Sequence, residues 1–148
     1  MSKLRTFLEL DRADQIATFE AMALLLYARL LIANVPPRRW RSRFGVVAAQ
    51  PGDAAPMNQL ATIRRMRLAI ARALRNVPGA PNCLPQALAG RWMLQRRGIA
   101  SSLFLGTQRD DHGVAHFHAW LKVGDEWVTG LCDENRYALF SALEAETA

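Results

Sequence analysis

The chain has 148 residues, of which 51% are apolar and 22% charged, and its formal net charge is +6. This length suits one domain, and this apolar content supplies a hydrophobic core, which excludes an intrinsically disordered chain. The two cysteines, Cys83 and Cys132, are too few for a disulfide framework, and no signal peptide is indicated near the N-terminus. We therefore expect free thiols in a reducing cytoplasm.

The first predicted helix spans residues 12–34. Asp11 is its expected N-cap, and Asp14 complements the positive end of the helix dipole. A Pro-Pro pair ends it. Its apolar run over residues 21–33 contains Arg29 and is shorter than the roughly 20 residues that cross a bilayer, so we expect a buried helix and no membrane span.

Further helices are expected between residues 38 and 97. Residues 38–44 favour one short helix, and residues 45–56 favour a loop because they contain glycine, proline and small side chains. Apolar side chains recur at helical spacing through residues 57–76. Another helix is predicted over residues 83–97, with Asn82 as its cap.

The remainder of the chain has the pattern of strands. We expect strands over residues 99–105, 114–123 and 126–132, with Gly124-Asp125 as a two-residue hairpin turn between the last two. A last short helix is predicted over residues 137–146. The fold class is therefore α+β, with a helical N-terminal half followed by a small antiparallel sheet on which a helix packs.

Arginines gather in three stretches, residues 38–43, 64–75 and 91–97. A nucleic-acid surface is one interpretation, but no helix-turn-helix, zinc knuckle or aromatic RNA-binding pattern accompanies the arginines, so we expect no nucleic-acid partner. A solvated basic face is a simpler explanation. A docking surface for an acidic peptide or partner protein is a third.

Cys83 and His118 are candidates for nucleophilic catalysis. Cys83 opens a predicted helix, where unpaired backbone N–H groups and the helix dipole favour the thiolate. His118 lies in a later predicted strand and is placed to act as the base. The N–H of Cys83 is a natural oxyanion donor, and Gln86 is one helical turn further on. A cysteine at a helix start followed by a strand histidine is typical of papain-like and transglutaminase-like thiol enzymes.

The same residues have plain structural explanations. A free cysteine is often a small buried apolar side chain, and a strand histidine is often a satisfied part of the core. Cys132 is interpreted as packing. His116 and Trp120 share the strand face of His118 and are cleft candidates.

No Cys or His grouping has metal-ligand spacing and no glycine-rich phosphate loop is present, so neither a metal nor a cofactor is expected.

Four motifs together resemble the leader-peptidase B proteins of lasso-peptide biosynthesis, which belong to the transglutaminase-like superfamily. They are CL-x-x-AL starting at Cys83, RRGI ending at Ile99, L-x-x-G ending at Gly106 and HAW starting at His118. The resemblance covers nearly the whole chain. It implies a papain/transglutaminase-like fold and a cysteine protease that removes the leader from a lasso-peptide precursor.

By this resemblance residues 1–148 form a single protease domain, with 1–56 as a helical N-terminal extension and 57–148 as the catalytic core. Cys83 would be the nucleophile and His118 the base. The implied partners are the precursor, a small β-rich winged protein that recognises the leader, and an asparagine-synthetase-like cyclase that closes the macrolactam. Because the N-terminal region is predicted to be helical, the recognition protein would act in trans.

The third catalytic residue departs from the family pattern. The family has an aspartate that orients the histidine, and Gly130 stands at the expected position. A turn at Gly124-Asp125 would place His118 opposite Leu131, and Asp133 would then share that face one step along. We therefore prefer Asp133, with a Cys-His dyad as the alternative.

Two other functions stay open. The same dyad would support amide transfer, which product analysis separates from hydrolysis. A chain without its orienting aspartate is also compatible with a non-catalytic binding or scaffold protein, in which Cys83 would react no faster than an ordinary thiol.

Overall fold

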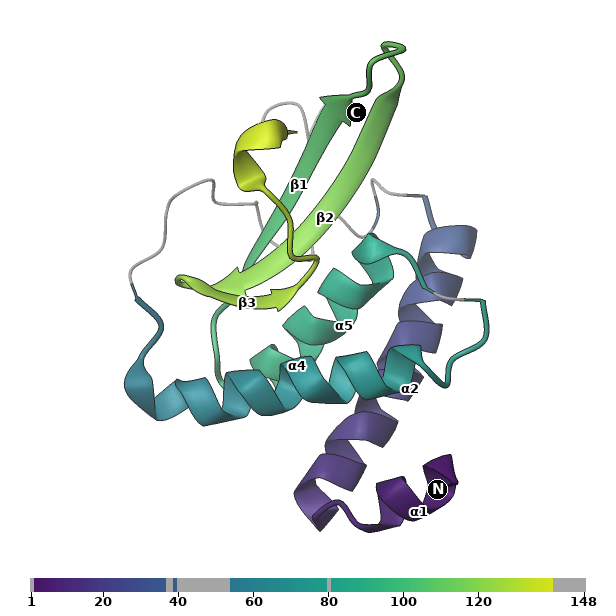
Figure 1. The fold of residues 1–148 in the computed structure, drawn as a ribbon, viewed down its shortest axis with the longest axis vertical. Helices are drawn as coiled ribbons and strands as arrows, with labels where there is room; N and C mark the ends of the chain where they lie inside the picture. The colour runs from purple at the N-terminus through teal and green to yellow at the C-terminus, as the bar shows by residue number, and fades with distance from the viewer. Residues whose placement is uncertain (1, 37–38, 40–53, 80, 140–148) are drawn as a thin grey trace.

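The computed structural model describes residues 2–36, 39, 54–79 and 81–139 (Figure 1). The short helix expected at residues 38–44 therefore lies outside the described residues except for position 39, as does most of the loop expected at 45–56. The described part confirms the α+β class, because helices make up the N-terminal half and an antiparallel sheet follows.

In the part of the chain that the structure describes, four α-helices and one short 3-10 helix precede the sheet. The predicted helix at residues 12–34 is confirmed, and those at 57–76 and 83–97 are confirmed with slightly shorter ends. A short helix before them was not predicted. The elements are α1 (Lys3–Leu8), α2 (Arg12–Asn34), the 3-10 helix η2 (Met57–Gln59), α4 (Leu60–Leu74) and α5 (Cys83–Gln95).

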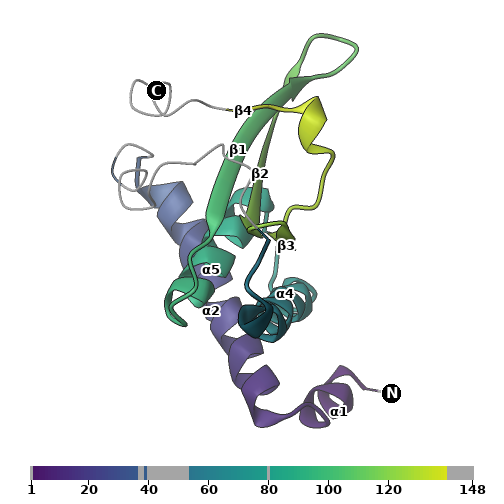
Figure 2. The same ribbon diagram turned by 90° about the vertical axis from the view of Figure 1, so that its left-hand side faces the viewer.

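Over the described residues, the sheet has four strands in the order β3-β2-β1-β4. The strands are β1 (Ser102–Arg109), β2 (Ala115–Val123), β3 (Glu126–Thr129) and β4 (Ala138–Leu139), with the 3-10 helix η3 (Glu134–Arg136) before β4. Strand β1 runs further than predicted, so β1 and β2 form a long hairpin that extends away from the helices (Figure 2).

The helix predicted from residue 137 is wrong where the structure describes it. Ala138 and Leu139 form β4 instead, pairing with Thr107 and Gly106 at the open edge of β1. The free hydrogen-bonding groups of that edge override the local helical pattern, which is the usual outcome when tertiary pairing competes with a weak propensity.

The predicted register between β2 and β3 holds only near the turn. Lys122 pairs with Trp127 as expected, but the register then shifts, so that Leu121 pairs with Thr129. Strand β3 ends at Thr129, and Gly130 follows with a φ of +73°. The expectation that His118 lies opposite Leu131 is therefore wrong, because an irregularity and an early strand end intervene.

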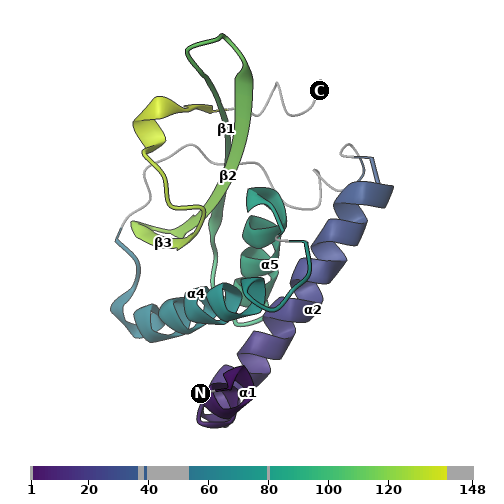
Figure 3. The same cartoon turned by 45° about the vertical axis from the view of Figure 1, so that its right-hand side comes forward.

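The hydrophobic core lies between the helices and one face of the sheet. Helix α2 packs against α4 and α5, and α5 packs against β2 (Figure 3). Leu25 of α2, Leu88 of α5 and Leu121 of β2 are all fully buried in this core. The other face of the sheet carries Trp120 and is crossed by the chain between β3 and β4 (Figure 1).

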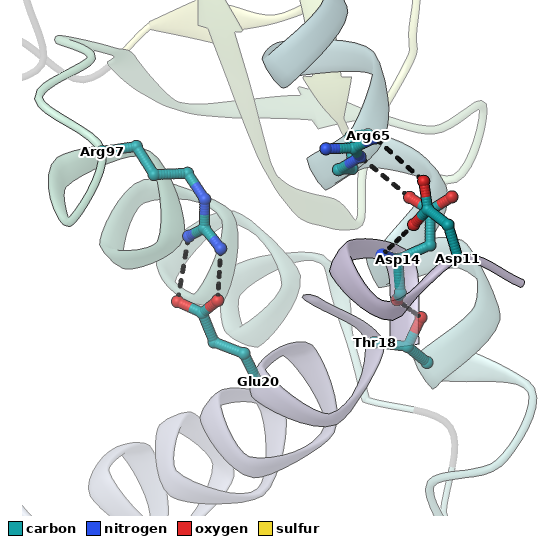
Figure 4. Close-up of polar contacts among 6 residues, drawn as sticks. All are labelled: Asp11, Asp14, Thr18, Glu20, Arg65 and Arg97. Atoms are coloured by element: carbon teal, nitrogen blue, oxygen red, sulfur yellow. Dashed lines mark hydrogen bonds and ion pairs between the residues drawn. The ribbon is translucent and has the colours of Figure 1, made fainter. Parts of the chain in front are cut away.

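Ion pairs fix α2 against its neighbours (Figure 4). Glu20 binds Arg97, just beyond α5, through two hydrogen bonds of 3.1 and 2.7 Å. Asp14 accepts a 3.0 Å hydrogen bond from Arg65 of α4. Asp11 accepts a 2.7 Å hydrogen bond from the backbone of Asp14, which confirms it as the N-cap of α2.

Among the described residues, α2 alone is long and apolar enough to cross a membrane by length and composition. Its most apolar window has a mean hydropathy of 1.8, and 28% of that window is buried in the protein. A core helix meets the same criterion, and the buried side chains of α2 face α4 and α5.

Candidate active site

Cys83 is the first residue of α5 and is half-buried. Asn82 occupies the N-cap position with an extended backbone, as predicted, but its side chain makes no capping hydrogen bond. The N–H groups at this helix start are consequently not occupied by a side-chain cap. They are available to stabilise negative charge on the Cys83 sulfur or on an oxygen bound beside it.

A groove with a volume of ≈ 650 Å³ opens beside Cys83. One wall comes from the C-terminal half of α2, another from the chain that enters α5, and a third from the side chain of Phe117 on β2. The groove is lined mainly by apolar atoms. Its lining residues are Arg29, Ile32, Ala33, Gly79, Pro81, Asn82, Cys83, Leu84, Pro85 and Phe117.

Two side chains hold the segment that leads into Cys83. Arg29 of α2 donates a hydrogen bond to the carbonyl of Pro78. Its guanidinium lies so close to Gly79 that a Cβ there would come within 2.9 Å of it, and Gly79 has a φ of +77°. Gln86 donates a 2.9 Å hydrogen bond to the carbonyl of Pro81. Gln86 therefore binds the loop, and its predicted part in an oxyanion site is not tested by this contact.

His118 is half-buried on β2 and is held by three neighbours. Its Nε2 lies 2.8 Å from the carbonyl oxygen of Gly130. Its ring stacks on Trp120 at a centroid distance of 5.7 Å and lies against Tyr137 at 5.3 Å. Because a carbonyl only accepts hydrogen bonds, Nε2 carries the proton in this contact when the ring is neutral.

The structure does not join Cys83 to His118 directly. Alternation along β2 places Phe117 on the face that borders the groove, and turns the ring of His118 to the face that carries Trp120. Within the described part of the chain, no hydrogen bond links the thiol with the imidazole. Cys83 and His118 thus lie on adjacent elements, α5 and β2. Phe117, the residue before His118 on β2, borders the groove, whereas the ring of His118 lies on the opposite face of the strand.

Trp120 is a buried anchor of the outer sheet face. It stacks on Phe104 with ring centroids 5.6 Å apart, and its Nε1 donates a 2.9 Å hydrogen bond to Glu134. Glu134 also pairs with Lys122 at 3.2 Å. This carboxylate fastens the segment after β3 to the sheet. The predicted cleft role of Trp120 is not tested by these contacts.

Asp133 does not approach the histidine through a hydrogen bond. It is exposed and caps η3, where its carboxylate accepts a 3.2 Å hydrogen bond from the backbone of Asn135. The group that contacts His118 at the position expected for an orienting carboxylate is the carbonyl of Gly130.

His116 lies further along the β1–β2 hairpin. Its Nε2 is 2.8 Å from a carboxylate oxygen of Asp110. Asp110 also accepts backbone hydrogen bonds from His112 and Val114. The pKa of Asp110 is lowered, chiefly by the hydrogen bond from His116. His116 therefore orders the end of the hairpin.

Cys132 is the second free thiol and lies in the segment of chain between β3 and η3. Burial raises its pKa, and the negative charges of Glu134 and Asp133 raise it further. A raised thiol pKa reduces the thiolate fraction at neutral pH, which is the reverse of what a nucleophile requires. Among the described residues, no group of three or more His, Cys, Asp or Glu side chains could hold a metal ion.

Residues 22–142 match the family model of the transglutaminase-like superfamily. The chain belongs to this superfamily. The superfamily includes cysteine proteases and transferases, and Cys83, His118 and the whole described sheet lie inside the matched range. Neither the curated proteins nor the solved structures contain a significant match to the chain.

Three residues of the site region were not predicted from the sequence. Glu134 and Tyr137 are brought onto the sheet by the turn after β3, and Arg29 reaches the loop before Cys83 from a helix distant in sequence. One indication in the sequence that Arg29 has a specific contact is that it is a charged residue inside an otherwise apolar helical run. The other two depend on the register shift, which no local pattern indicates.

Proposed function

We propose that this protein is a cysteine protease that removes the leader from a lasso-peptide precursor, with Cys83 as nucleophile and His118 as base. The observation that carries the proposal is the position of Cys83, at the uncapped start of α5 and on the wall of a groove, in a chain of the transglutaminase-like superfamily. The lasso assignment rests on the combination of the four sequence motifs.

The proposed reaction has two steps. The Cys83 thiolate attacks the carbonyl carbon of the scissile peptide bond, and His118 receives the thiol proton and passes it to the departing amine. The leader is then bound to Cys83 as a thioester, and the core peptide leaves with a free amino group. Water hydrolyses the thioester, which releases the leader with a carboxylate and restores the thiol. N–H groups at the start of α5 are placed to stabilise the oxyanion in both steps.

This mechanism requires the imidazole to reach the thiol. The two side chains are not hydrogen-bonded in the described structure, so the proposal requires their contact to form when the precursor is bound. Catalytic hydrogen bonds that tighten only in the substrate complex are common. Phe117, which precedes His118 on β2, lines the groove, so this contact requires the chain at Phe117 and His118 to rearrange.

The groove favours an extended peptide with an apolar side chain beside the scissile bond. Ile32, Ala33 and Phe117 provide the apolar lining. A leader-recognition protein would deliver the precursor in trans, and an asparagine-synthetase-like cyclase would use the amine that cleavage releases. An arginine-rich surface is suited to meet an acidic segment of either partner.

The test is leader cleavage by purified protein supplied with precursor and the recognition protein, followed by mass spectrometry. Cys83→Ala is expected to lose cleavage with an unchanged circular dichroism spectrum, whereas the matched variant Cys132→Ala is expected to keep it. Retained cleavage by Cys83→Ala would refute the proposal. A new amide in place of a hydrolysed bond would instead indicate amide transfer by the same residues.

A non-catalytic binding protein of the same fold is the second candidate. It is favoured by the separation of Cys83 from His118 across β2, and by the finding that no carboxylate among the described residues is hydrogen-bonded to that histidine. Alkylation by iodoacetamide distinguishes the two in the presence of the recognition protein and precursor. A catalytic Cys83 loses reactivity when His118 is replaced by Gln, whereas the thiol of a binding protein does not.

A further inference from the structure

We infer that the main-chain carbonyl of Gly130 takes the place of an orienting carboxylate and holds His118 as the tautomer with its proton on Nε2. The inference rests on the proposed function only in so far as His118 is the base. The tautomer itself is a property of the folded chain.

The first support is the contact and its direction. His118 Nε2 and the Gly130 oxygen are 2.8 Å apart, an ordinary hydrogen-bond length. The acceptor has no proton to give, so Nε2 is the donor and Nδ1 keeps its lone pair. A base with a free Nδ1 is what the proposed proton transfer from a thiol needs.

The second support is that the backbone at position 130 is built for glycine. Gly130 has a φ of +73°, and a Cβ there would lie 2.5 Å from the carbonyl oxygen of Ala119 and 2.9 Å from Cβ of Trp120. A side chain at this position would collide with β2, and residues other than glycine rarely adopt this left-handed backbone conformation. Another residue would therefore fit only if the surrounding backbone moved. The glycine lets the chain approach β2 closely enough for its carbonyl to reach the histidine.

The third support is that the nearby acids are engaged elsewhere. Asp133 caps η3 through Asn135, and Glu134 binds Trp120 and Lys122. The imidazole packs against the rings of Trp120 and Tyr137, which also contact each other. The carbonyl therefore does not compete with a carboxylate for Nε2 in the described chain.

The direct test is long-range ¹H–¹⁵N NMR of the three histidines in the folded protein, at a pH where the imidazoles are neutral. His118→Gln assigns the His118 signals by their loss. We expect a protonated, pyrrole-type Nε2 and an unprotonated, pyridine-type Nδ1 for His118, unchanged in Asp133→Asn. A proton on Nδ1, fast averaging between the two tautomers, or a change of tautomer in Asp133→Asn would overturn the inference.

A second test separates this account from a missing aspartate. If the chain had simply lost its acid, Gly130→Asp would raise the His118-dependent rate of Cys83 alkylation, measured with the precursor and the recognition protein present. Here we expect Gly130→Asp to lower that rate by about 100-fold, the size of a lost general base, with Gly130→Ala equally impaired because both carry the Cβ. A higher rate in Gly130→Asp than in the natural chain would contradict the inference. Failure of leader cleavage would refute the proposed function and leave the NMR result standing.

Discussion

The two thiols of this chain lie in opposite electrostatic surroundings. Cys83 stands at the positive end of a helix, and Cys132 lies beside Glu134 and Asp133. A single chain thus contains one thiol at a helix N-terminus and another whose pKa is raised by its surroundings.

Cys132 is expected to react slowly with iodoacetamide when the protein is folded. Its pKa is raised by burial and by the neighbouring carboxylates, so at pH 7 to 8 its thiolate fraction is below that of an ordinary cysteine. The measurement is the alkylation rate of Cys132 in Cys83→Ala, folded and in concentrated urea, where the surroundings are lost. A folded rate equal to or above the rate in urea would contradict the assignment.

The placement of Cys83 could be predicted at the residue level, but the group that contacts His118 could not. The position of Cys83 at a helix start follows from the Asn-Cys-Leu-Pro sequence, because proline is tolerated in a first helical turn. The preference for Asp133 depended on a regular hairpin. The register shift beside Leu121 and the left-handed Gly130 changed what reaches His118, and neither leaves a periodic signal.

Helix α2 is attached to the end of α5 by a partly buried ion pair. The Glu20 side chain is 9% exposed and binds Arg97 through both carboxylate oxygens, with Arg96 close to one of them at 3.5 Å. A bidentate pair of this kind contributes more than an exposed one. It helps to set how α2, which forms one wall of the groove, lies against the helix that carries Cys83.

Glu20→Gln is therefore expected to lower the free energy of unfolding by about 1 kcal/mol. The matched control is Glu9→Gln, which removes a pair with Arg5 whose side chains are 58% and 71% exposed and which should change the stability by less than about 0.5 kcal/mol. Urea unfolding of the three proteins gives the comparison. Equal stabilities of Glu20→Gln and the natural chain would show that the pair does not fix α2.

The elements themselves were largely predictable because each has its own local signals. Helix α2 begins at the predicted N-cap Asp11, and the β2–β3 turn has glycine at its first central position with a φ of +57°. The wrong helix prediction at residues 138–139 has a different cause. Two residues pair with the edge of β1 because the preceding chain brings them there, which depends on the whole fold.

At the scale of the whole molecule, one core joins the helical half to the sheet. It includes side chains from α2, α4, α5 and the inner sheet face, while a second, aromatic cluster covers the outer face. Cys83 lies at the border of the first core, and His118 belongs to the second. The proposed catalytic pair therefore spans the sheet, and its formation depends on how β2 meets the start of α5.

The packing of α2 predicts a contrast between two neighbouring leucines. Leu25 is fully buried and Leu26 is 41% exposed. Leu25→Ala is expected to lower the free energy of unfolding by about 2–5 kcal/mol, and Leu26→Ala by less than about 1 kcal/mol. Urea unfolding without detergent measures both. Similar effects at the two positions would contradict the packing of α2 as a core helix.

The central claim, that Cys83 carries the leader as a thioester, is tested most directly by trapping that intermediate. The protein is mixed with precursor and recognition protein, quenched in acid within the first turnover, digested and analysed by mass spectrometry. The account predicts a mass increase equal to the leader acyl group on the peptide that contains Cys83, absent from Cys83→Ala and not found on Cys132. Leader cleavage that proceeds equally well in Cys83→Ala, with no acyl group on either thiol, would contradict it.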